Sequence, residues 1–324
     1  MLLVALGASG YLVYRHMSNN IAQVNLEAYI GKQPADLHPQ AENILIIGSG
    51  SAQGAAAGAA GAGNQLGTLM LVHIAGDRQW AEVMSIPPDA RVSLTSYTPA
   101  RGQRSAPAQP KVGGVALGVA NTIKALERDT GIYVNHFIVM NSDGFKGMVS
   151  ALGGVEERNL AAVDNPRAKL VLTPAQALTY AHGVFSPGGV SGQARTTLQA
   201  ALAASLVARA RGDLSNPLAT YRFLDAFTRS LTIDSQLGGI TGLYHLAQVL
   251  HGMPAGKIAF FALPGSQRAG VALADATGVP WAQPAESEIL ASFRDDVPAS
   301  HAVLAVADRP GKSGVSASAR RGAS

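Results

Sequence analysis

The sequence predicts a three-layer α/β/α sandwich with a central mixed sheet. Short apolar runs rich in β-branched residues alternate along the chain with segments whose apolar residues recur at helical spacing. Apolar residues make up 47% of the 324 residues and charged residues only 14%, so the chain can bury a sizeable core. No internal repeat of the kind that builds solenoids or propellers is present.

The predicted strands are short apolar runs bounded by turn residues. The turn Ala75-Gly76-Asp77-Arg78 separates two of them and predicts a hairpin, whereas residues 99–113, rich in Pro, Gln, Ser and basic residues, predict a surface loop. The predicted strands cover residues 44–47, 69–74, 80–86, 137–140 and 257–263.

The predicted helices have apolar residues on one face and recognisable ends. Gly131 closes the first helix as a C-cap, Asn141-Ser142 can cap the second, and Thr173-Pro174 is a typical N-cap and first-turn pair. The helices are expected over residues 115–126, from about 143, over 174–182 and 196–211, from Asn216-Pro217, and over 237–250.

The amino-terminal segment is uncharged and mostly apolar from Leu2 to Tyr14, before Arg15. A helix of this length reaches roughly 20 Å, short of a hydrocarbon core of about 30 Å. We therefore expect a truncated membrane anchor. A buried amino-terminal helix is the alternative, and a signal peptide would need a basic residue before Arg15. The expected divisions are an anchor at 1–15, an extracytoplasmic stalk at 16–42, a domain at 43–264, and an extension at 265–324 that is largely disordered from about 297.

Composition excludes several function classes. The net charge is only +4, and much of the basic surplus lies in the tail among Ser, Gly and Ala, at Arg309, Lys312, Arg320 and Arg321. Basic patches with interleaved aromatic residues are absent, so no nucleic-acid partner is predicted. The chain has no cysteine, which excludes disulfides, thiolate metal sites and a cysteine nucleophile.

The glycine-rich stretch after the first strand raises the question of a phosphate loop. Gly48-Ser49-Gly50-Ser51-Ala52 is followed by Gln53, so the third glycine of a dinucleotide fingerprint is one place late. The sequence also lacks the ending of a P-loop, a nucleophile elbow and a paired-histidine zinc motif. The glycine-alanine run at 54–63 is therefore interpreted as a flexible surface loop.

A more specific pattern occupies residues 130–137 (TGIYVNHF) and 143–156 (DGFKGMVSALGGVE). It resembles the central signature of the LytR-CpsA-Psr (LCP) family, T-G-I-x-I-D-H-Y followed by D-G-F-x-x-L-V-D-A-L-G-G-V-E. Further pieces resemble family motifs in the same order, so that the resemblance spans roughly residues 43–264. These pieces are residues 43–49, 68–74, 83–89 and 175–180.

The resemblance implies a protein with one membrane helix and an extracytoplasmic domain containing a hydrophobic channel for a polyprenyl-pyrophosphate lipid. It implies phosphotransfer of a glycopolymer from that lipid to peptidoglycan, with magnesium and several arginines neutralising the pyrophosphate. The expected location is the cell membrane, single-pass, with the domain outside the cytoplasm.

The chain departs from the family at its charged positions. The aspartate and arginine of the family's G-S-D-S-R strand are Gly50 and Ala52, and the R-S-D-T motif reads Gln65-Leu66-Gly67-Thr68. Pro88 replaces the arginine of S-I-P-R-D, and His182 and Val184 replace the two arginines of Y-V-R-x-R. Arg195 lies one position away from an arginine of the family's D-x-x-R-x-x-R-Q run. No catalytic residue and no metal ligand is assigned. The candidates for binding a lipid phosphate are Ser49, Lys111, His182 and Arg195.

Two functions follow from this pattern of losses. The first is a degenerate family member of cell-envelope assembly that binds polyprenyl-phosphate lipid, wall polymer such as peptidoglycan, or an active LCP paralogue. Burying a pyrophosphate without cations costs several kcal/mol per ion, which argues against catalysis of phosphotransfer by this chain. The alternative is an active glycopolymer phosphotransferase that uses replaced side chains and Mg²⁺. Transcriptional regulation is not predicted, because nothing resembles a DNA-reading helix pair.

Overall fold

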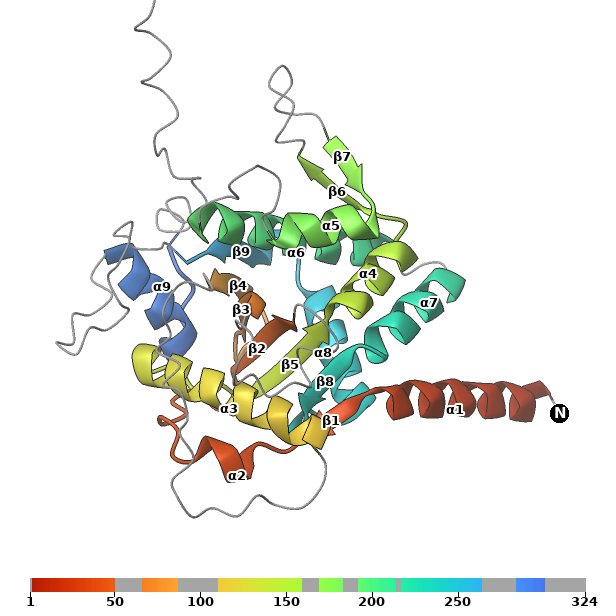
Figure 1. The fold of residues 1–324 in the computed structure, drawn as a ribbon, viewed down its shortest axis with the longest axis horizontal. Coiled ribbons are helices and arrows are strands. Elements are labelled where there is room, and N and C mark those ends of the chain that lie inside the picture. Colours follow the sequence, from red (N-terminus) through yellow and green to blue (C-terminus); the bar gives the residue numbers. More distant parts are fainter. Residues whose placement is uncertain are drawn as a thin grey trace, which may run out of the picture.

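The computed structural model describes residues 2–49, 66–86, 110–158, 169–182, 192–213, 217–263 and 284–300. Within these ranges a seven-stranded sheet lies at the centre, in the order β1-β8-β5-β2-β3-β4-β9, and helices surround it (Figure 1). The strands of this sheet are β1 (Ala22–Val24), β2 (Glu42–Ser49), β3 (Leu66–Ile74), β4 (Ala81–Ile86), β5 (His136–Asn141), β8 (Leu231–Asp234) and β9 (Ile258–Ala262).

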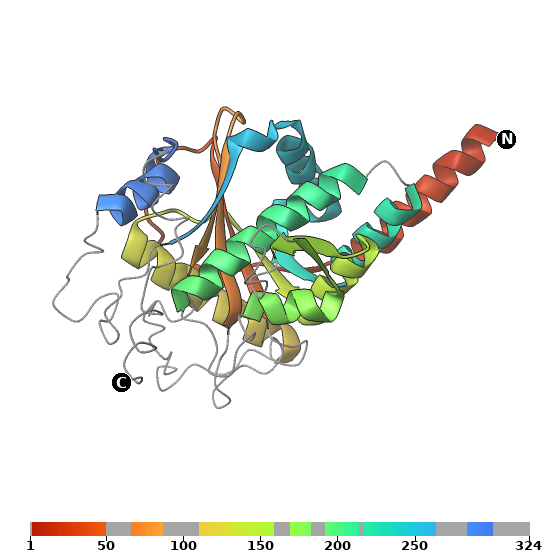
Figure 2. The same cartoon turned by 90° about the horizontal axis from the view of Figure 1, so that it is seen from above.

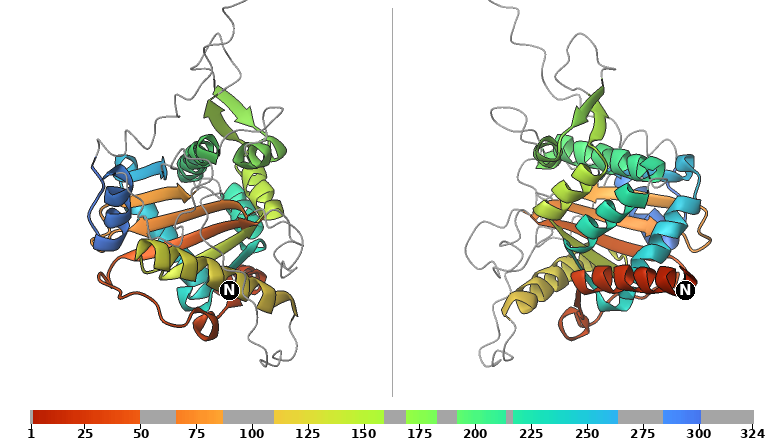
Figure 3. Two further views of the ribbon diagram at one scale, coloured as in Figure 1. Left: turned by 60° about the vertical axis from the view of Figure 1, so that its left-hand side comes forward. Right: turned by 90° about the vertical axis from the view of Figure 1, so that its right-hand side faces the viewer.

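The sheet is mixed, as predicted. Its middle strand β2 pairs antiparallel with β3 and parallel with β5. The predicted hairpin is confirmed, because β3 and β4 pair antiparallel across the turn at residues 75–80. Strand β9 is added parallel to β4, while β8 is antiparallel to β5 and β1 parallel to β8. A separate hairpin of β6 (Val155–Arg158) and β7 (Lys169–Leu172) projects from the body (Figure 3).

The helices form where caps and apolar spacing predict them. Asn141 accepts a hydrogen bond from the Gly144 N–H at 2.8 Å, and Gly131 follows α3 with a φ of 71° that suits glycine. The helices are α1 (Leu2–Asn20), α2 (Glu27–Ile30), α3 (Pro110–Thr130), α4 (Ser142–Ala151), α5 (Pro174–His182), α6 (Gly192–Asp213), α7 (Pro217–Thr228), α8 (Gly239–Gly252) and α9 (Pro284–Asp295).

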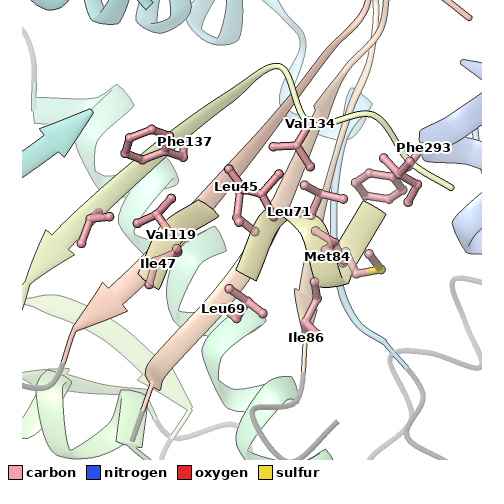
Figure 4. Packing of buried hydrophobic residues seen from close by; sticks show 14 of the residues in the cluster. Leu45, Ile47, Leu69, Leu71, Met84, Ile86, Val119, Val134, Phe137 and Phe293 are labelled. Carbon is pink, nitrogen blue, oxygen red and sulfur yellow. The ribbon is translucent and has the colours of Figure 1, made fainter. Parts of the chain in front are cut away.

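Alternation along the strands divides the core into two layers of side chains. Leu45, Leu71 and Met84 point to the face covered by α3 and α9, where they pack with Val119 and Phe293 (Figure 4). The intervening residues, including Ile44, Val72 and Val83, pack on the other face with side chains of α6, α7 and α8. Figure 2 shows α3 and α9 on one side of the strands and α6 on the other. The predicted α/β/α layering is therefore confirmed.

Both expected domain boundaries differ in the structure. Residues 16–42 do not form a separate stalk, because β1 joins the sheet edge, and Met17, Val24 and Leu26 are buried. Strand β1 has only three residues, which is too short for the alternation of apolar and polar residues to be recognised in the sequence. At the other end α9 lies beyond residue 264 but buries Phe293 in the core.

Helix α1 includes the segment expected to be a membrane anchor. Among the described residues, no helix combines the length and apolarity of a membrane span.

Candidate functional site

One end of the sheet, here called the site edge, collects the ends of several elements. Strand β2 ends at Ser49, which is paired with Leu66 at the start of β3 and with Asn141 at the end of β5. The register shifts between Gly48 and Ser49, so a bulge lies at this point, and such bulges re-aim the following residue. A Cβ on Gly48 would lie 3.1 Å from the Thr68 Cβ, so the close approach of β2 and β3 favours glycine.

Helices α3, α4, α5 and α6 also begin or end at the site edge. Helix α4 starts directly after β5, α5 ends with Ala181 and His182, and α6 starts at Gly192. Helix α3 precedes β5 in the chain, is joined to it by residues 131–135, and runs antiparallel to it. The first residues of α3, Pro110 and Lys111, therefore lie at the same edge. The fold therefore brings the backbone of Ser49, Lys111, His182 and Arg195 to one edge, while their side chains lie outside the described part of the structure.

Behind this edge lies a buried polar group, here called the Gln199 cluster. Ser85 Oγ donates to Gln199 Oε1 at 3.0 Å, and Gln199 Nε2 donates to Thr68 Oγ1 at 3.1 Å and to the Ala181 carbonyl at 2.8 Å. The carbonyl can only accept, which fixes the orientation of the amide. The cluster is uncharged and joins β3 and β4 to α5 and α6.

The described charges nearest this edge form a neutral pair. Asp143 and Lys146, on the first turn of α4, lie 2.8 Å apart, and both side chains are exposed. The described residues contain no group of three or more His, Asp or Glu side chains that would hold a metal ion. The described part of the site edge therefore does not fit a magnesium site.

Comparison with known proteins decides the family. A model of the LytR_cpsA_psr family matches residues 13–279. The chain belongs to this family. The resemblance predicted from its motifs is thereby confirmed, and membership supports a role in cell-envelope glycopolymer transfer.

Solved structures of LytR_cpsA_psr proteins share the fold. An LytR-Csp2A-Psr enzyme from Actinomyces oris superimposes with a TM-score of 0.56 at 18% identity, covering 84% of this chain and 95% of that one. B. subtilis TagV gives 0.52 at 19% identity over 80% and 98% of the two chains, and TagT bound to LIIa-WTA gives 0.51 at 17% over 77% and 91%. No curated protein matches the chain in sequence.

The family's charged positions that are uncharged here lie close in the chain to the strands that end or begin at the site edge. Gly67 is the second residue of β3, while Gly50 and Ala52 follow β2 along the chain, Gln65 precedes β3, and Pro88 follows β4. Apart from Gly67, these residues and Val184 lie outside the described ranges. The Gln199 cluster was not predicted. The available signal was a glutamine beside Leu198 and Leu202 on the buried side of α6.

The buried titratable groups of the sheet lie at its opposite end. His73 on β3 is buried; its Nδ1 lies 2.8 Å from Asn43 Oδ1 and its Nε2 3.0 Å from Asp296 Oδ1. Asn43 Nδ2 donates to the carbonyls of Tyr133 and Phe293, so Oδ1 must face the imidazole. Burial lowers the pKa of His73, and the Asp296 carboxylate partly offsets this effect.

Glu82 is the direct cross-strand partner of His73 and is also buried. Its Oε1 accepts from the Ala299 N–H at 2.9 Å, and its Oε2 lies 2.7 Å from Ser292 Oγ. Ser292 has one hydroxyl proton and lies equally close to the Ile289 carbonyl, so a protonated Glu82 satisfies all three groups. Burial raises the pKa of Glu82, which agrees with this arrangement.

Proposed function

We propose that this protein is a cell-envelope member of the LytR_cpsA_psr family that binds a polyprenyl-phosphate lipid or its glycopolymer without catalysing phosphotransfer. The observation that carries the proposal is the loss, in the sequence, of charged residues at positions of the family motifs. Gly50, Ala52, Gln65, Gly67 and Pro88 stand where the family motifs have charged residues.

Phosphotransfer depends on positioning and on neutralising the charge that develops on the phosphoryl oxygens. The Gln199 cluster offers no charge, and its donors already have acceptors within the protein. The Asp143–Lys146 pair is neutral as a whole and faces solvent. A buried pyrophosphate at this edge would have no described cation to replace its lost hydration, so catalysis is disfavoured.

Binding is supported by the family and the fold. TagT, which shares the fold, has been solved with LIIa-WTA bound, and we propose a lipid-linked wall polymer of this general kind as the ligand here. We further propose a hydrophobic channel, as the family resemblance implies. Lys111, His182 and Arg195 belong to elements that meet at the site edge and are the proposed contacts for a phosphate, together with Ser49.

For cellular location we propose a single-pass anchor that includes residues 1–15, with the domain outside the cytoplasm. An active paralogue is a further proposed partner, because a binding protein without chemistry can deliver or retain the lipid for an enzyme. No step is assigned to Mg²⁺, since both aspartate positions of the family motifs are glycine.

The proposal can be tested with the full chain purified in detergent. We expect polyprenyl lipid to be found in its extract by mass spectrometry. Turnover of a polyprenyl-pyrophosphate substrate with Mg²⁺ should be at least about 100-fold below that of an active family enzyme. The variant carrying Gly50→Asp, Gln65→Arg and Pro88→Arg tests whether the missing charges account for the difference. Wild-type turnover equal to that of the active enzyme would support the alternative, an active phosphotransferase.

A further inference from the structure

Helices α1 and α7 lie side by side and run in the same direction (Figures 1 and 2). His16 Nε2 lies 2.9 Å from Asp225 Oδ1, and one turn later Asn20 Nδ2 lies 3.4 Å from Thr228 Oγ1. Because one turn along α1 corresponds to one turn along α7, the amino-terminal ends of the two helices point the same way. Arg229, which directly follows α7, also donates from Nε to Asp225 at 3.1 Å.

The turn of α1 before His16 is exposed on every side. Tyr11, Leu12, Val13 and Tyr14 are consecutive, and all four are exposed. With 3.6 residues per turn, four consecutive residues cover the whole circumference of the helix. A helix that is apolar all round is suited to a protein core or to lipid, whereas a protein partner docking on one side would leave half of it in water.

The corresponding turn of α7 carries a tyrosine and an arginine. Tyr221 and Arg222 lie four and three residues before Asp225, on the side that faces α1, and both are exposed. Arg15 and Arg229 add positive charge at the same level, while the Asp225 carboxylate is already bonded to His16 and Arg229. Within the described part of the chain, Arg15 and Arg222 form no ion pair.

We propose that this α1–α7 tip, comprising Tyr11–Arg15, Tyr221, Arg222 and Arg229, docks onto an anionic phospholipid surface. Aromatic rings at the boundary and arginines just outside it are the composition that favours the membrane interface and anionic head groups. A tether through α1 alone leaves the domain free to swing, whereas contact through α7 fixes its orientation. The inference goes beyond the proposed function, because an anchor by itself predicts no lipid contact for α7.

The absence of cysteine allows single labels to be placed in the full chain. We would attach an environment-sensitive fluorophore at Tyr221→Cys, and at Tyr29→Cys on α2 as a control, since both tyrosines are 38% exposed. The label at 221 is expected to shift to the blue with vesicles containing phosphatidylglycerol, and the label at 29 to stay unchanged. A label at Tyr14→Cys reports on α1. If it enters lipid while the label at 221 remains in water, α1 is a simple tether and the docking proposal is wrong.

Charge reversal gives a second test. Arg222→Glu is expected to lower partitioning into vesicles containing phosphatidylglycerol about tenfold, with little effect on vesicles of phosphatidylcholine alone. Lys124→Glu reverses a charge at an exposed position of α3, on the other face of the sheet, and should have no effect. Equal losses in both variants would show non-specific attraction and overturn the proposal. Co-purified polyprenyl lipid, measured separately, keeps this outcome distinct from failure of the proposed function.

Discussion

The two ends of the central sheet differ in the kind of polar side chain that the described residues place there. At the site edge, the described polar side chains of Thr68, Ser85 and Gln199 are neutral and bond to one another. At the opposite end, His73 and Glu82 are buried side by side and reach α9 and the residues that follow it. Buried titratable groups thus join distant segments at the opposite end, whereas the described Gln199 cluster at the site edge contains no titratable side chain.

The opposite end depends on complete hydrogen bonding. The Asn43 side chain bonds to two backbone carbonyls and to the His73 imidazole, and the Asn43 N–H donates to the Asn135 side chain. If this hydrogen bonding at the opposite end stabilises the fold, Asn43→Ala should lower the free energy of unfolding by about 3 kcal/mol, because it leaves several buried groups without partners. Urea denaturation measures this loss, with Asn25→Ala at an exposed position as the control. Equal stability of the two variants would remove the basis for treating the opposite end as structural.

The site edge is expected to tolerate substitution somewhat better. Gln199→Leu fills a similar volume but leaves the Ser85 hydroxyl and the Ala181 carbonyl unpaired, so we expect a loss of about 2 kcal/mol. Gln248→Leu removes a hydrogen bond from an exposed glutamine and serves as the control. A loss larger than that of Asn43→Ala would reverse the order proposed for the two ends.

The pH dependence of stability isolates Glu82 at the opposite end. Its folded pKa is raised, so its contribution is fully present below the unfolded value near 4.5 and is lost as the pH rises through the folded pKa. Glu82→Gln keeps a donor to Ser292 and an acceptor for Ala299, and should therefore gain stability relative to wild type as the pH increases. Urea denaturation of both proteins between about pH 4 and 8 tests this expectation.

His73 serves as the internal reference for that experiment. Its pKa is lowered, so its contribution is present above the ordinary value of 6.5 and is lost as the pH falls through the folded pKa. The effect has the opposite sign and is common to both proteins, so it largely cancels in their difference. A difference that stays constant with pH would contradict the assignment of a raised pKa to Glu82.

The smallest effect is expected from exposed charge at the same end of the sheet. Arg294 forms two hydrogen bonds with the adjacent Asp295, but both side chains are about 40% exposed. Arg294→Ala should change the free energy of unfolding by less than about 0.5 kcal/mol. A loss comparable with that of Asn43→Ala would show that burial is not what distinguishes these charges.

Local patterns in the sequence predicted most of the fold. The apolar runs of β2, β3, β4, β5 and β9 were found because periodicity and turn residues are local signals. Strands β1 and β8, with three and four residues, were missed because their stability comes from pairing with each other and with β5. Helix α9 was missed for a similar reason, because its apolar residues are few and are recognisable as core residues only from their packing against the sheet.

The candidate site was predicted less completely. Family motifs identified which positions had lost charge, and the fold brings the described ones to one edge. The Gln199 cluster joins residues 114 positions apart, and a single sequence contains no signal for that pairing. The membrane anchor, the lipid channel and the loss of catalysis remain predictions.

The first strand and the last helix have a consequence for how the protein is made. Strand β1 can pair at the sheet edge only after β8 has been synthesised, and the hydrogen bond between Ser292 and Glu82 joins residues 210 positions apart. Contacts of such long range slow folding, because the entropy of loop closure opposes them before they stabilise anything. A growing chain therefore stays incomplete until α9 has emerged, and if it is exported unfolded, its core closes only after nearly the whole polypeptide has crossed the membrane.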